Sequence, residues 1–247
     1  MAQLLLTRPQ EGADRFAALL RRSGFDAPIV TSPLLQIVPL AAPELADLTE
    51  DQAVIFTSRN GVAAAPVGQG RLAYVVGAST GHAAKAAGYR VVQADGDAEA
   101  LFRRILADHQ AGNLTGDLVH LHGRHTRGDL AQRLTAAGIP TKGAVIYEQI
   151  AMPLSEAAKS LLSGAEPVIL PIFSPRTAAL LLAECQQMER TAPLFVAAIS
   201  PAADVELGML QAVQRQILPN PTADAMAAAV QRLMAAAQRL EGEIRQR

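Results

Sequence analysis

The chain has no tryptophan, few other aromatic residues and a single cysteine. Its 247 residues include 3 Tyr and 6 Phe, and Cys185 is the only thiol. One cysteine cannot form a disulfide within the chain, and its helical surroundings, AALLLAECQQM, predict a thiol in or near the core. The scarcity of aromatic rings argues against a surface that stacks nucleobases. A formal net charge of −1 without any basic run likewise argues against a nucleic-acid partner.

Long hydrophobic runs are also missing, although half of the residues are hydrophobic. No apolar stretch approaches the length of a transmembrane helix, so no membrane partner is expected. The opening MAQLLLTRP is a short apolar run closed by Thr-Arg-Pro, which favours a first strand over a signal peptide. We therefore expect a cytoplasmic protein.

Motifs for nucleotides and metals are weak or missing. Neither Gly-x-Gly-x-x-Gly nor a P-loop occurs, which argues against a nucleotide cofactor. Three histidines lie in HLHGRHTRGD. His120 and His122 would share one face of a strand, and His125 could close a metal site. Only Asp129 offers a nearby carboxylate, and strand histidines are usually structural or solvated, so neither a metal nor another cofactor is predicted.

Short apolar strands alternate with alanine-rich amphipathic helices along the chain. The expected strands are Gln3–Leu6, Ala27–Val30, Ala53–Phe56, Leu72–Val76, Arg90–Gln93, Leu118–Leu121, Thr141–Val145, Pro167–Ile172, Leu194–Ala198 and Gln216–Leu218. The helices are expected to begin near Glu11, Gly61, Ser79, Ala98, Arg127, Ser155, Thr177, Pro201 and Thr222. This alternation predicts parallel sheets covered by helices on both faces. The strands are too many for one small sheet, and no eight-fold repeat supports a barrel, so we predict two similar α/β domains.

An internal repeat supports two related halves. VIFTSRNGVAAA is matched by ILPIFSPRTAALL, YVVGASTGHAAKAAGYRVV by FVAAISPAADVELGMLQAV, and DGDAEALFRRIL by PNPTADAMAAAV. The opening LLLTRPQEGADRFAALL is matched by LVHLHGRHTRGDLAQRL. These matches align Ser58 with Ser174, Gly77 with Ser200 and Arg8 with Arg124.

The order of the repeats predicts that the chain starts one domain, builds the second, and returns to finish the first. We expect a discontinuous domain of residues 1–34 plus 152–247 and a continuous domain of residues 41–144. The linkers, 35–40 and 145–151, are apolar and β-prone, so they can pair into a short ladder that acts as a hinge. A hinge of this kind places a cleft between the domains, where ligands commonly bind.

These residues resemble the uroporphyrinogen-III synthase family. The resemblance rests on the order and spacing of LLLTRP, VIFTSRNGV, YVVGASTGHAAKAAGY, VIYEQ, IFSPRTA and PTADAMAAAV, which span nearly the whole chain. It implies two α/β domains joined by a two-strand connector, in a monomer. It also implies the substrate hydroxymethylbilane, a linear tetrapyrrole with eight carboxylates, which the family cyclises with loss of water and inversion of the last ring. The family uses neither cofactor nor metal. The upstream bilane-forming enzyme is a further candidate partner, through transient contact.

The candidate substrate-binding residues lie at four strand-to-helix turns. Such turns present unpaired backbone N–H groups to an anion, and parallel sheets gather them at the carboxyl ends of strands. The alternative is that their hydroxyl and amide side chains only cap the following helices. The residues are Thr57, Ser58, Asn60, Gly77, Ser79, Thr80, Ser174, Arg176, Thr177, Ser200 and Ala202.

The resemblance assigns roles to some of these side chains. Thr80 matches a family hydroxyl, and Ser174 matches the turn that reads Phe-Ser-Pro. At the last turn the family usually has Gly-Pro-Thr-Thr, whereas this chain has Ser200 followed by Pro-Ala-Ala, so both threonine hydroxyls are missing. Tyr147 corresponds to the family's closest approach to a catalytic group, which hydrogen-bonds or protonates the departing hydroxyl. The alternative for Tyr147 is a strand tyrosine that packs on one face with its hydroxyl in solvent.

Five arginines follow predicted strand ends, and arginine pairs bidentately with carboxylates. Arg8 and Arg176 are favoured as substrate clamps, with Arg124 expected to face them; the other two candidates are Arg59 and Arg127. Two other functions stay open from the sequence. One is a hinged cytoplasmic protein that binds a small anion without catalysis, and the other is a different two-domain transferase.

Overall fold

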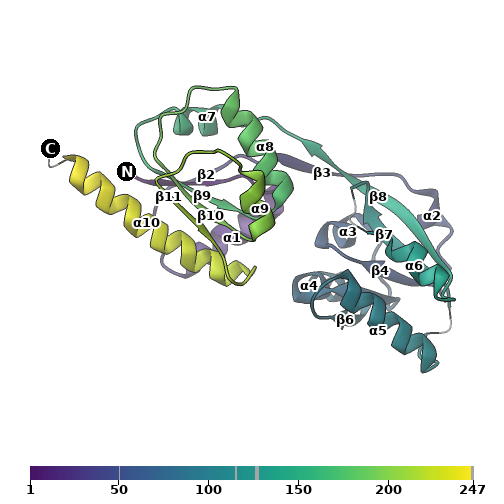
Figure 1. Cartoon of the computed structure of the whole chain (residues 1–247). Helices are drawn as coiled ribbons and strands as arrows, with labels where there is room; N and C mark the ends of the chain where they lie inside the picture. Colours follow the sequence, from purple (N-terminus) through teal and green to yellow (C-terminus); the bar gives the residue numbers. More distant parts are fainter. Residues whose placement is uncertain (50, 115, 126–127, 246–247) are drawn as a thin grey trace. The chain divides into compact units, whose positions relative to one another are not determined.

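The computed structural model describes residues 1–49, 51–114, 116–125 and 128–245, and the chain forms two compact units (Figure 1). Unit 1 comprises residues 1–36 and 150–247, and unit 2 comprises residues 37–149. The domain boundaries that we expected from the repeat order were residues 1–34 plus 152–247 and residues 41–144. No helix among the described residues is both long enough and apolar enough to cross a membrane.

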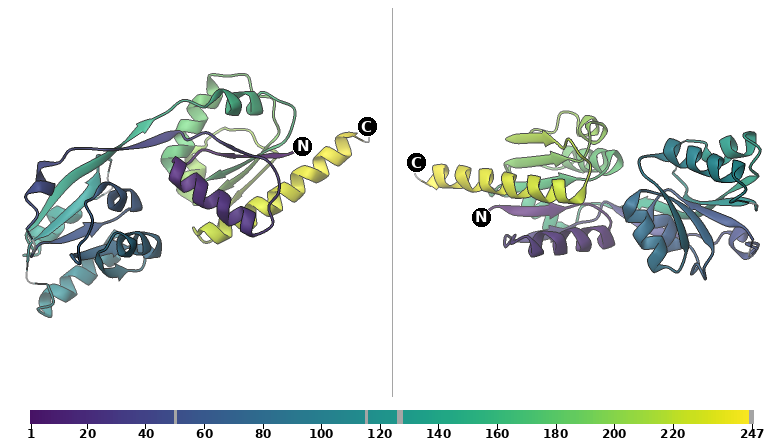
Figure 2. Two further views of the ribbon diagram at one scale, coloured as in Figure 1. Left: turned by 180° about the vertical axis from the view of Figure 1, so that it is seen from behind. Right: turned by 90° about the horizontal axis from the view of Figure 1, so that it is seen from below.

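Unit 1 is a five-stranded parallel sheet in the order β11-β10-β9-β1-β2. Its strands are β1 (Gln3–Leu6), β2 (Ile29–Thr31), β9 (Val168–Ile172), β10 (Leu194–Ala198) and β11 (Gln214–Ile217). Its helices are α1 (Gln10–Arg22), α7 (Glu156–Leu162), α8 (Pro175–Gln186), α9 (Pro201–Glu206) and α10 (Ala223–Arg245). Side chains of α1 and α10 form one core with the sheet, and those of α7, α8 and α9 form another, so helices cover both faces (Figure 2). The buried Cys185 lies in the second core, as its sequence surroundings predicted.

Unit 2 has a six-stranded sheet in the order β3-β8-β7-β4-β5-β6. Its strands are β3 (Leu35–Pro39), β4 (Ala53–Phe56), β5 (Leu72–Val76), β6 (Arg90–Ala94), β7 (Leu118–Gly123) and β8 (Thr141–Ala151). Its helices are α2 (Pro43–Ala46), α3 (Arg59–Ala64), α4 (Gly77–Ala86), α5 (Ala98–Gln110) and α6 (Leu130–Ala136). Residues of α3 and α4 pack on one face of the sheet, and residues of α5 and α6 pack on the other.

The two sheets share one strand order, which confirms the prediction of two similar parallel α/β domains. In unit 1, β10, β9, β1 and β2 follow one another across the sheet, and β5, β4, β7 and β8 do so in unit 2. The aligned residues therefore occupy equivalent places. Ser58 and Ser174 follow β4 and β9, while Arg8 and Arg124 follow β1 and β7.

Several boundaries differ from the sequence-based expectation. Strand β2 begins two residues later than predicted, because its partly exposed residues give a weak apolar signal. Strand β8 is one element of 11 residues, since the expected linker 145–151 continues its ladder. Helix α6 begins at Leu130; the predicted start near Arg127 lies outside the described residues. Helices α4 and α8 each begin two residues earlier than predicted, and the four-residue helix α2 was not predicted at all.

Candidate functional site

In unit 2, candidate residues gather at the carboxyl edge of the sheet. Thr57 follows β4, Gly77 follows β5 and Arg124 follows β7, and these three strands are neighbours in a parallel arrangement. Gly77 has a φ of +74°, in the left-handed region that favours glycine, so the chain turns directly from strand into α4 there. The predicted convergence of these turns within unit 2 therefore occurs.

Ser58 caps helix α3, as the alternative interpretation of this turn proposed. Its hydroxyl oxygen accepts a hydrogen bond from the Asn60 backbone N–H at 3.2 Å. Arg59, from the same turn, donates from Nη1 to the Ser79 hydroxyl at 3.4 Å, which links the starts of α3 and α4. Thr80, in the first turn of α4, is only 6% exposed. The Thr80 side chain is therefore largely within the core, whereas Ser79 is at the surface.

Tyr147 reaches this edge through an irregularity in the β7–β8 ladder. His122 pairs with Val145, but Gly123 pairs with Tyr147, so β8 carries one extra residue. Such a bulge re-aims the side chains that follow it. The Tyr147 ring packs in the core beneath α3 and is 6% exposed. The packing of the ring agrees with the alternative of a strand tyrosine that packs on one face.

Burial raises the pKa of Tyr147, and hydrogen bonds with the Ser58 side chain and the Gly123 backbone oppose this shift. The net direction is upward from the ordinary value of 10. The phenol is consequently protonated near neutral pH, where it can donate a hydrogen bond but cannot act as a base. Ser58 thus serves both its helix and Tyr147.

Two histidines lie behind this edge, on the α6 face of β7. The Nε2 atom of His120 lies 3.4 Å from the Thr57 hydroxyl, and the His120 and His122 rings stand 4.8 Å apart. Burial lowers the pKa of His120 to about 4, and repulsion from His122 adds to the effect. His120 is therefore neutral at physiological pH and supports Thr57 from inside the unit.

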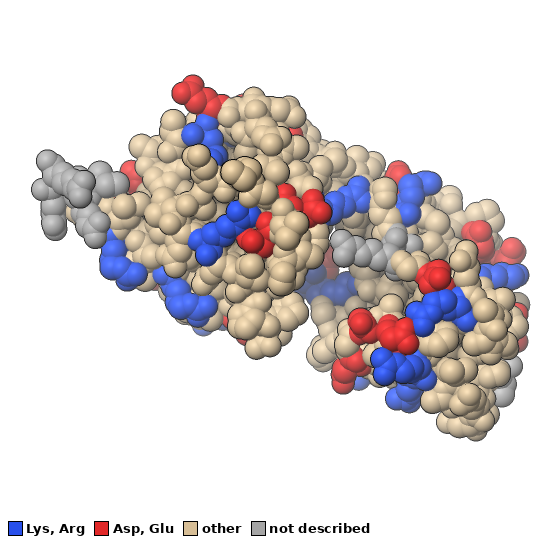
Figure 3. Space-filling view, in the orientation of Figure 1, with Lys and Arg blue, Asp and Glu red and all other residues tan. Residues whose placement is uncertain are grey.

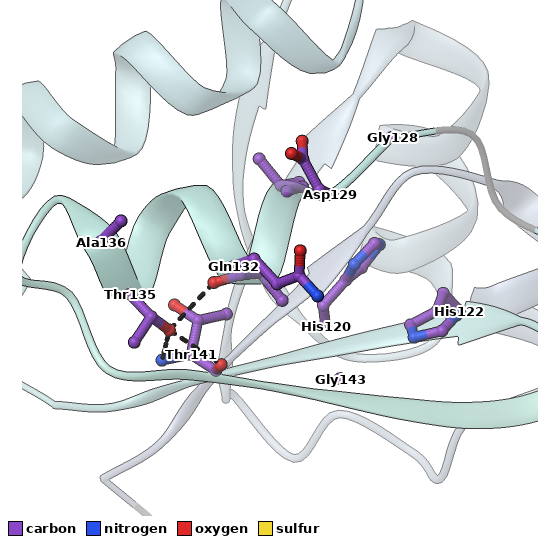
Figure 4. A pocket seen from close by; sticks show the side chains of 11 residues that line it. His120, His122, Gly128, Asp129, Gln132, Thr135, Ala136, Thr141 and Gly143 are labelled. Atoms are coloured by element: carbon purple, nitrogen blue, oxygen red, sulfur yellow. Dashed lines mark hydrogen bonds between the residues drawn. The ribbon is translucent and has the colours of Figure 1, made fainter.

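A pocket of about 720 Å³ adjoins the two histidines, between β7, β8 and α6 (Figure 4). Asp129, Gln132 and Thr135 are among its lining residues, and Thr135 is already bonded to the backbone of Ala131 and Thr141. Within the described part of the chain, no three His, Cys, Asp or Glu residues stand close enough to hold a metal ion.

In unit 1, Arg8 lies at the carboxyl edge of β1. Its guanidinium lies 4.0 Å from the centre of the Phe173 ring, which in turn packs edge-on against Phe16. A cation over an aromatic face is attracted by the ring quadrupole and is held in one orientation. Phe173 follows β9 directly, so it places the Arg8 guanidinium beside the start of α8.

Ser174 caps α8 through two hydrogen bonds. Its hydroxyl oxygen accepts the Thr177 backbone N–H at 3.1 Å, and the hydroxyl donates to Thr177 Oγ1 at 2.9 Å. Ser200 caps α9 in the same way, accepting the Ala203 N–H at 3.3 Å. Both serine side chains are thus engaged with their own helices, as the capping alternative proposed. Thr177 is 2% exposed, while Ala202 is exposed at the surface of α9.

The cap at Ser174 predicts a measurable loss of stability. Ser174→Ala is expected to lower the free energy of unfolding by about 1 kcal/mol, because an N–H at the start of α8 loses its partner. Urea titration followed by circular dichroism measures the change. Ser160→Ala, at an exposed serine within α7, is the control and should change stability by a few tenths of a kcal/mol at most. Equal stability of the two variants would contradict the cap.

The structure brings the predicted site residues together in two groups, each within one unit. Unit 2 gathers Thr57, Ser58, Asn60, Gly77, Ser79, Thr80, Arg124 and Tyr147, and unit 1 gathers Arg8, Ser174, Arg176, Thr177, Ser200 and Ala202. Arg124 donates from Nε to Glu148 at 3.1 Å, so a carboxylate partner already stands beside it. Arg127 lies outside the described residues. Sequence reasoning missed Phe173 and Gly123, whose importance lies in contacts with residues distant along the chain.

Charged side chains of both signs are interspersed on the face in view, in keeping with the net charge of −1 (Figure 3). An anionic ligand would therefore be held by local groups at the strand ends rather than by a broad positive field.

Known proteins share this sequence pattern and fold. The family described as Uroporphyrinogen-III synthase HemD matches residues 14–228. The crystal structure of uroporphyrinogen-III synthetase from Helicobacter pylori 26695 has a TM-score of 0.63 at 20% identity, and the match covers 94% of this chain and 100% of that one. A mutant uroporphyrinogen III synthase from the extremely thermophilic bacterium Thermus thermophilus has a TM-score of 0.52 at 14% identity, with 96% and 100% covered. No curated protein sequence matches significantly. Because the family match covers most of the chain, the protein belongs to the uroporphyrinogen-III synthase family.

Proposed function

We propose that the protein cyclises the linear tetrapyrrole hydroxymethylbilane to uroporphyrinogen III, as a lyase that removes water. Family membership makes it an enzyme of heme biosynthesis, and the family match over residues 14–228 is the observation that carries the proposal. The reaction expels the bilane hydroxyl, inverts the last pyrrole ring and closes the macrocycle. Because free bilane closes unaided to the type I isomer, the enzyme's task is to enforce one ring-closing geometry.

Tyr147 is the residue we assign to the departing hydroxyl. Its phenol is protonated near neutral pH because burial raises its pKa, and its oxygen is already oriented by Ser58 and Gly123. A protonated, oriented phenol can donate a hydrogen bond to the leaving oxygen as negative charge develops there. This role needs neither a metal nor a cofactor.

Each unit by itself offers arginines and helix starts that can bind carboxylates of the bilane. Arg8 and Arg176 in unit 1 and Arg124 in unit 2 offer guanidinium groups that match carboxylates. The starts of α4 and α8 also offer backbone N–H groups. A side-chain cap pairs with only part of the N–H groups in the first turn of a helix, so the others can bind a carboxylate. Thr80→Val and Ser174→Ala should therefore weaken substrate binding only slightly.

Isomer analysis tests the proposed function. Purified protein is incubated with freshly generated hydroxymethylbilane, the product is oxidised, and the porphyrin isomers are separated by chromatography. Type III should dominate with the protein and type I without it. A product that stays type I at every protein concentration would refute the proposal and leave a non-catalytic anion-binding role.

Chelation provides a further prediction. Exhaustive treatment with a strong chelator is expected to leave activity unchanged, because Tyr147, the arginines and the backbone amides supply the proposed chemistry. The measurement is the initial rate of type III formation before and after treatment, with untreated protein passed through the same desalting column. A loss of activity that zinc restores would contradict it and would point to His120 and His122.

We also propose that the reaction takes place in the cytoplasm, beside the enzyme that releases the bilane. Transient contact between the two enzymes would shorten the time during which free bilane can close to type I. In a coupled assay, direct transfer keeps the type I fraction below the value calculated from the separately measured rates of free bilane closure and capture. A type I fraction equal to that value would show free diffusion instead.

A further inference from the structure

The ring of Tyr147 lies in a slot whose nearest wall is Gly123. A Cβ atom built on Gly123 would stand 2.6 Å from both Cε2 and Cζ of Tyr147 and 2.9 Å from its hydroxyl oxygen. Real Cβ atoms do not approach other heavy atoms so closely. The φ angle of Gly123 lies outside the left-handed region, so the backbone there would accept another residue. Contact with the Tyr147 ring is therefore what requires glycine at position 123.

The opposite edge of the Tyr147 ring has more room, so the ring can shift in that direction. A Cβ on Gly61, in α3, would stand 3.9 Å from Cε1 of Tyr147 and 3.0 Å from the Leu121 carbonyl oxygen. Cδ1 of Phe56, which belongs to the same core as Tyr147, lies 3.4 Å from that position on Gly61. The ring thus sits between the backbone of β7 and the first turns of α3, and its hydroxyl is directed along the slot toward Ser58 and the Gly123 backbone.

The Gly123 peptide is itself held in place. Its carbonyl accepts a hydrogen bond from Nδ1 of His122 at 2.9 Å. The next peptide N–H, that of Arg124, donates to the Tyr147 carbonyl at 2.9 Å. Both bonds lie at the bulge that places Gly123 opposite Tyr147. The wall of the slot is therefore rigid, and a side chain on it would displace the ring and leave the wall where it is.

We propose that Gly123 is a positioning residue for Tyr147, which sets the place of the phenol hydroxyl at the carboxyl edge of unit 2. The kinetic part of this proposal rests on the proposed function, whereas the structural part does not. The close approach of the Tyr147 ring leaves room only for a hydrogen atom on Gly123. A single added methyl group is therefore expected to move the hydroxyl without removing it.

Fluorine NMR tests the structural part. The chain has 3 tyrosines, so protein labelled with 3-fluorotyrosine gives a small spectrum that Tyr→Phe variants assign. Gly123→Ala should shift the Tyr147 resonance and leave those of Tyr74 and Tyr89 in place. Gly242→Ala, where an added Cβ meets nothing within 4 Å, is the control and should shift none of them. An unmoved Tyr147 resonance in Gly123→Ala would overturn the proposal.

Kinetics test the positioning role. Gly123→Ala should lower kcat at least tenfold, toward the level of Tyr147→Phe, with KM changed less than about threefold. Added to Tyr147→Phe, the same substitution should lower kcat by less than about threefold further, because the hydroxyl that it displaces is already gone. Full kcat in Gly123→Ala, or losses that multiply in the double variant, would overturn the proposal. If the wild-type protein forms no type III product, the proposed function fails. The NMR result still shows whether a side chain at position 123 displaces Tyr147.

Folding of the variant provides one more comparison. If Gly123→Ala does not fold, Gly123→Ala combined with Tyr147→Leu should restore the native circular dichroism spectrum, because the smaller side chain vacates the space beside position 123. Restoration supports the tight contact between Gly123 and Tyr147. A double variant that still does not fold would overturn the proposal, since the defect would then lie elsewhere.

Discussion

Tyr147→Phe is expected to lower turnover about tenfold to a thousandfold while leaving substrate binding nearly unchanged. Removing one hydrogen-bond donor to developing charge costs roughly 1.4–4 kcal/mol of transition-state stabilisation. The bilane hydroxyl also leaves spontaneously, so residual activity remains. The measurements are kcat and KM for bilane consumption together with the isomer ratio of the product. Because the pKa of Tyr147 is raised by burial, no loss of activity through its deprotonation is expected below pH 9.

Tyr89→Phe is the matched control for this substitution. Tyr89 is a second buried tyrosine of unit 2, and its hydroxyl donates to the Pro66 carbonyl at 2.6 Å, in the loop after α3. Its loss should lower the free energy of unfolding by about 1 kcal/mol and leave kcat unchanged. If Tyr147→Phe keeps wild-type turnover and still yields type III alone, Tyr147 is a packing residue and enforced geometry alone directs ring closure.

Acidification is expected to destabilise unit 2 by about 3 kcal/mol through His120 alone. An unfolded histidine has a pKa near 6.5, whereas burial lowers that of folded His120 to about 4. Above pH 6.5 both states are neutral and the full stability is present. Between pH 6.5 and 4 only the unfolded chain takes up the proton, so stability falls as the pH falls. Below pH 4 both states are protonated and the loss is complete.

Urea titrations at several pH values between 7 and 4 measure this effect. Between pH 7 and pH 4, the free energy of unfolding of His120→Gln should fall by about 3 kcal/mol less than that of the wild type. This difference is expected whatever the stability of the variant at pH 7. Gln110→Ala, which changes an exposed residue without a titratable group at the end of α5, is the control and should keep the wild-type pH dependence. Parallel curves for wild type and His120→Gln would show that His120 is protonated without cost in the folded protein.

Burial explains which parts of the fold the sequence predicts well. The bounds of β1, β4, β5 and β10 match the expected ranges, because these central strands are buried almost throughout and read as unbroken apolar runs that end at a turn residue. Strands β2 and β11 lie at sheet edges and are only partly buried, so their runs are weaker and their predicted bounds were shifted. The continuation of β8 was recognised only as a β-prone linker, because Glu148 and Gln149 interrupt the apolar pattern.

In the candidate site, too, some features follow from local sequence and others do not. The caps at Ser58, Ser174 and Ser200 follow from local sequence, since a hydroxyl before a helix is a local signal. The closeness of Gly123 to Tyr147 does not, because it depends on a bulge between two strands that are far apart in sequence. In the sequence, Gly123 stands among histidines and arginines and reads as the beginning of a loop.

The division of unit 1 between both ends of the chain affects how the protein emerges from the ribosome. Strand β1, with Leu4, Leu5 and Leu6 fully buried in the finished fold, is made first, but its neighbour β9 begins only at Val168. At synthesis rates of roughly 5–20 residues per second, β1 waits on the order of ten seconds for that partner. Residues 37–149, which form unit 2, are contiguous and are all made within this interval. Until β9 is made, only α1 and β2 of unit 1 are available to cover these leucines, so the nascent chain exposes apolar surface to which chaperones can bind.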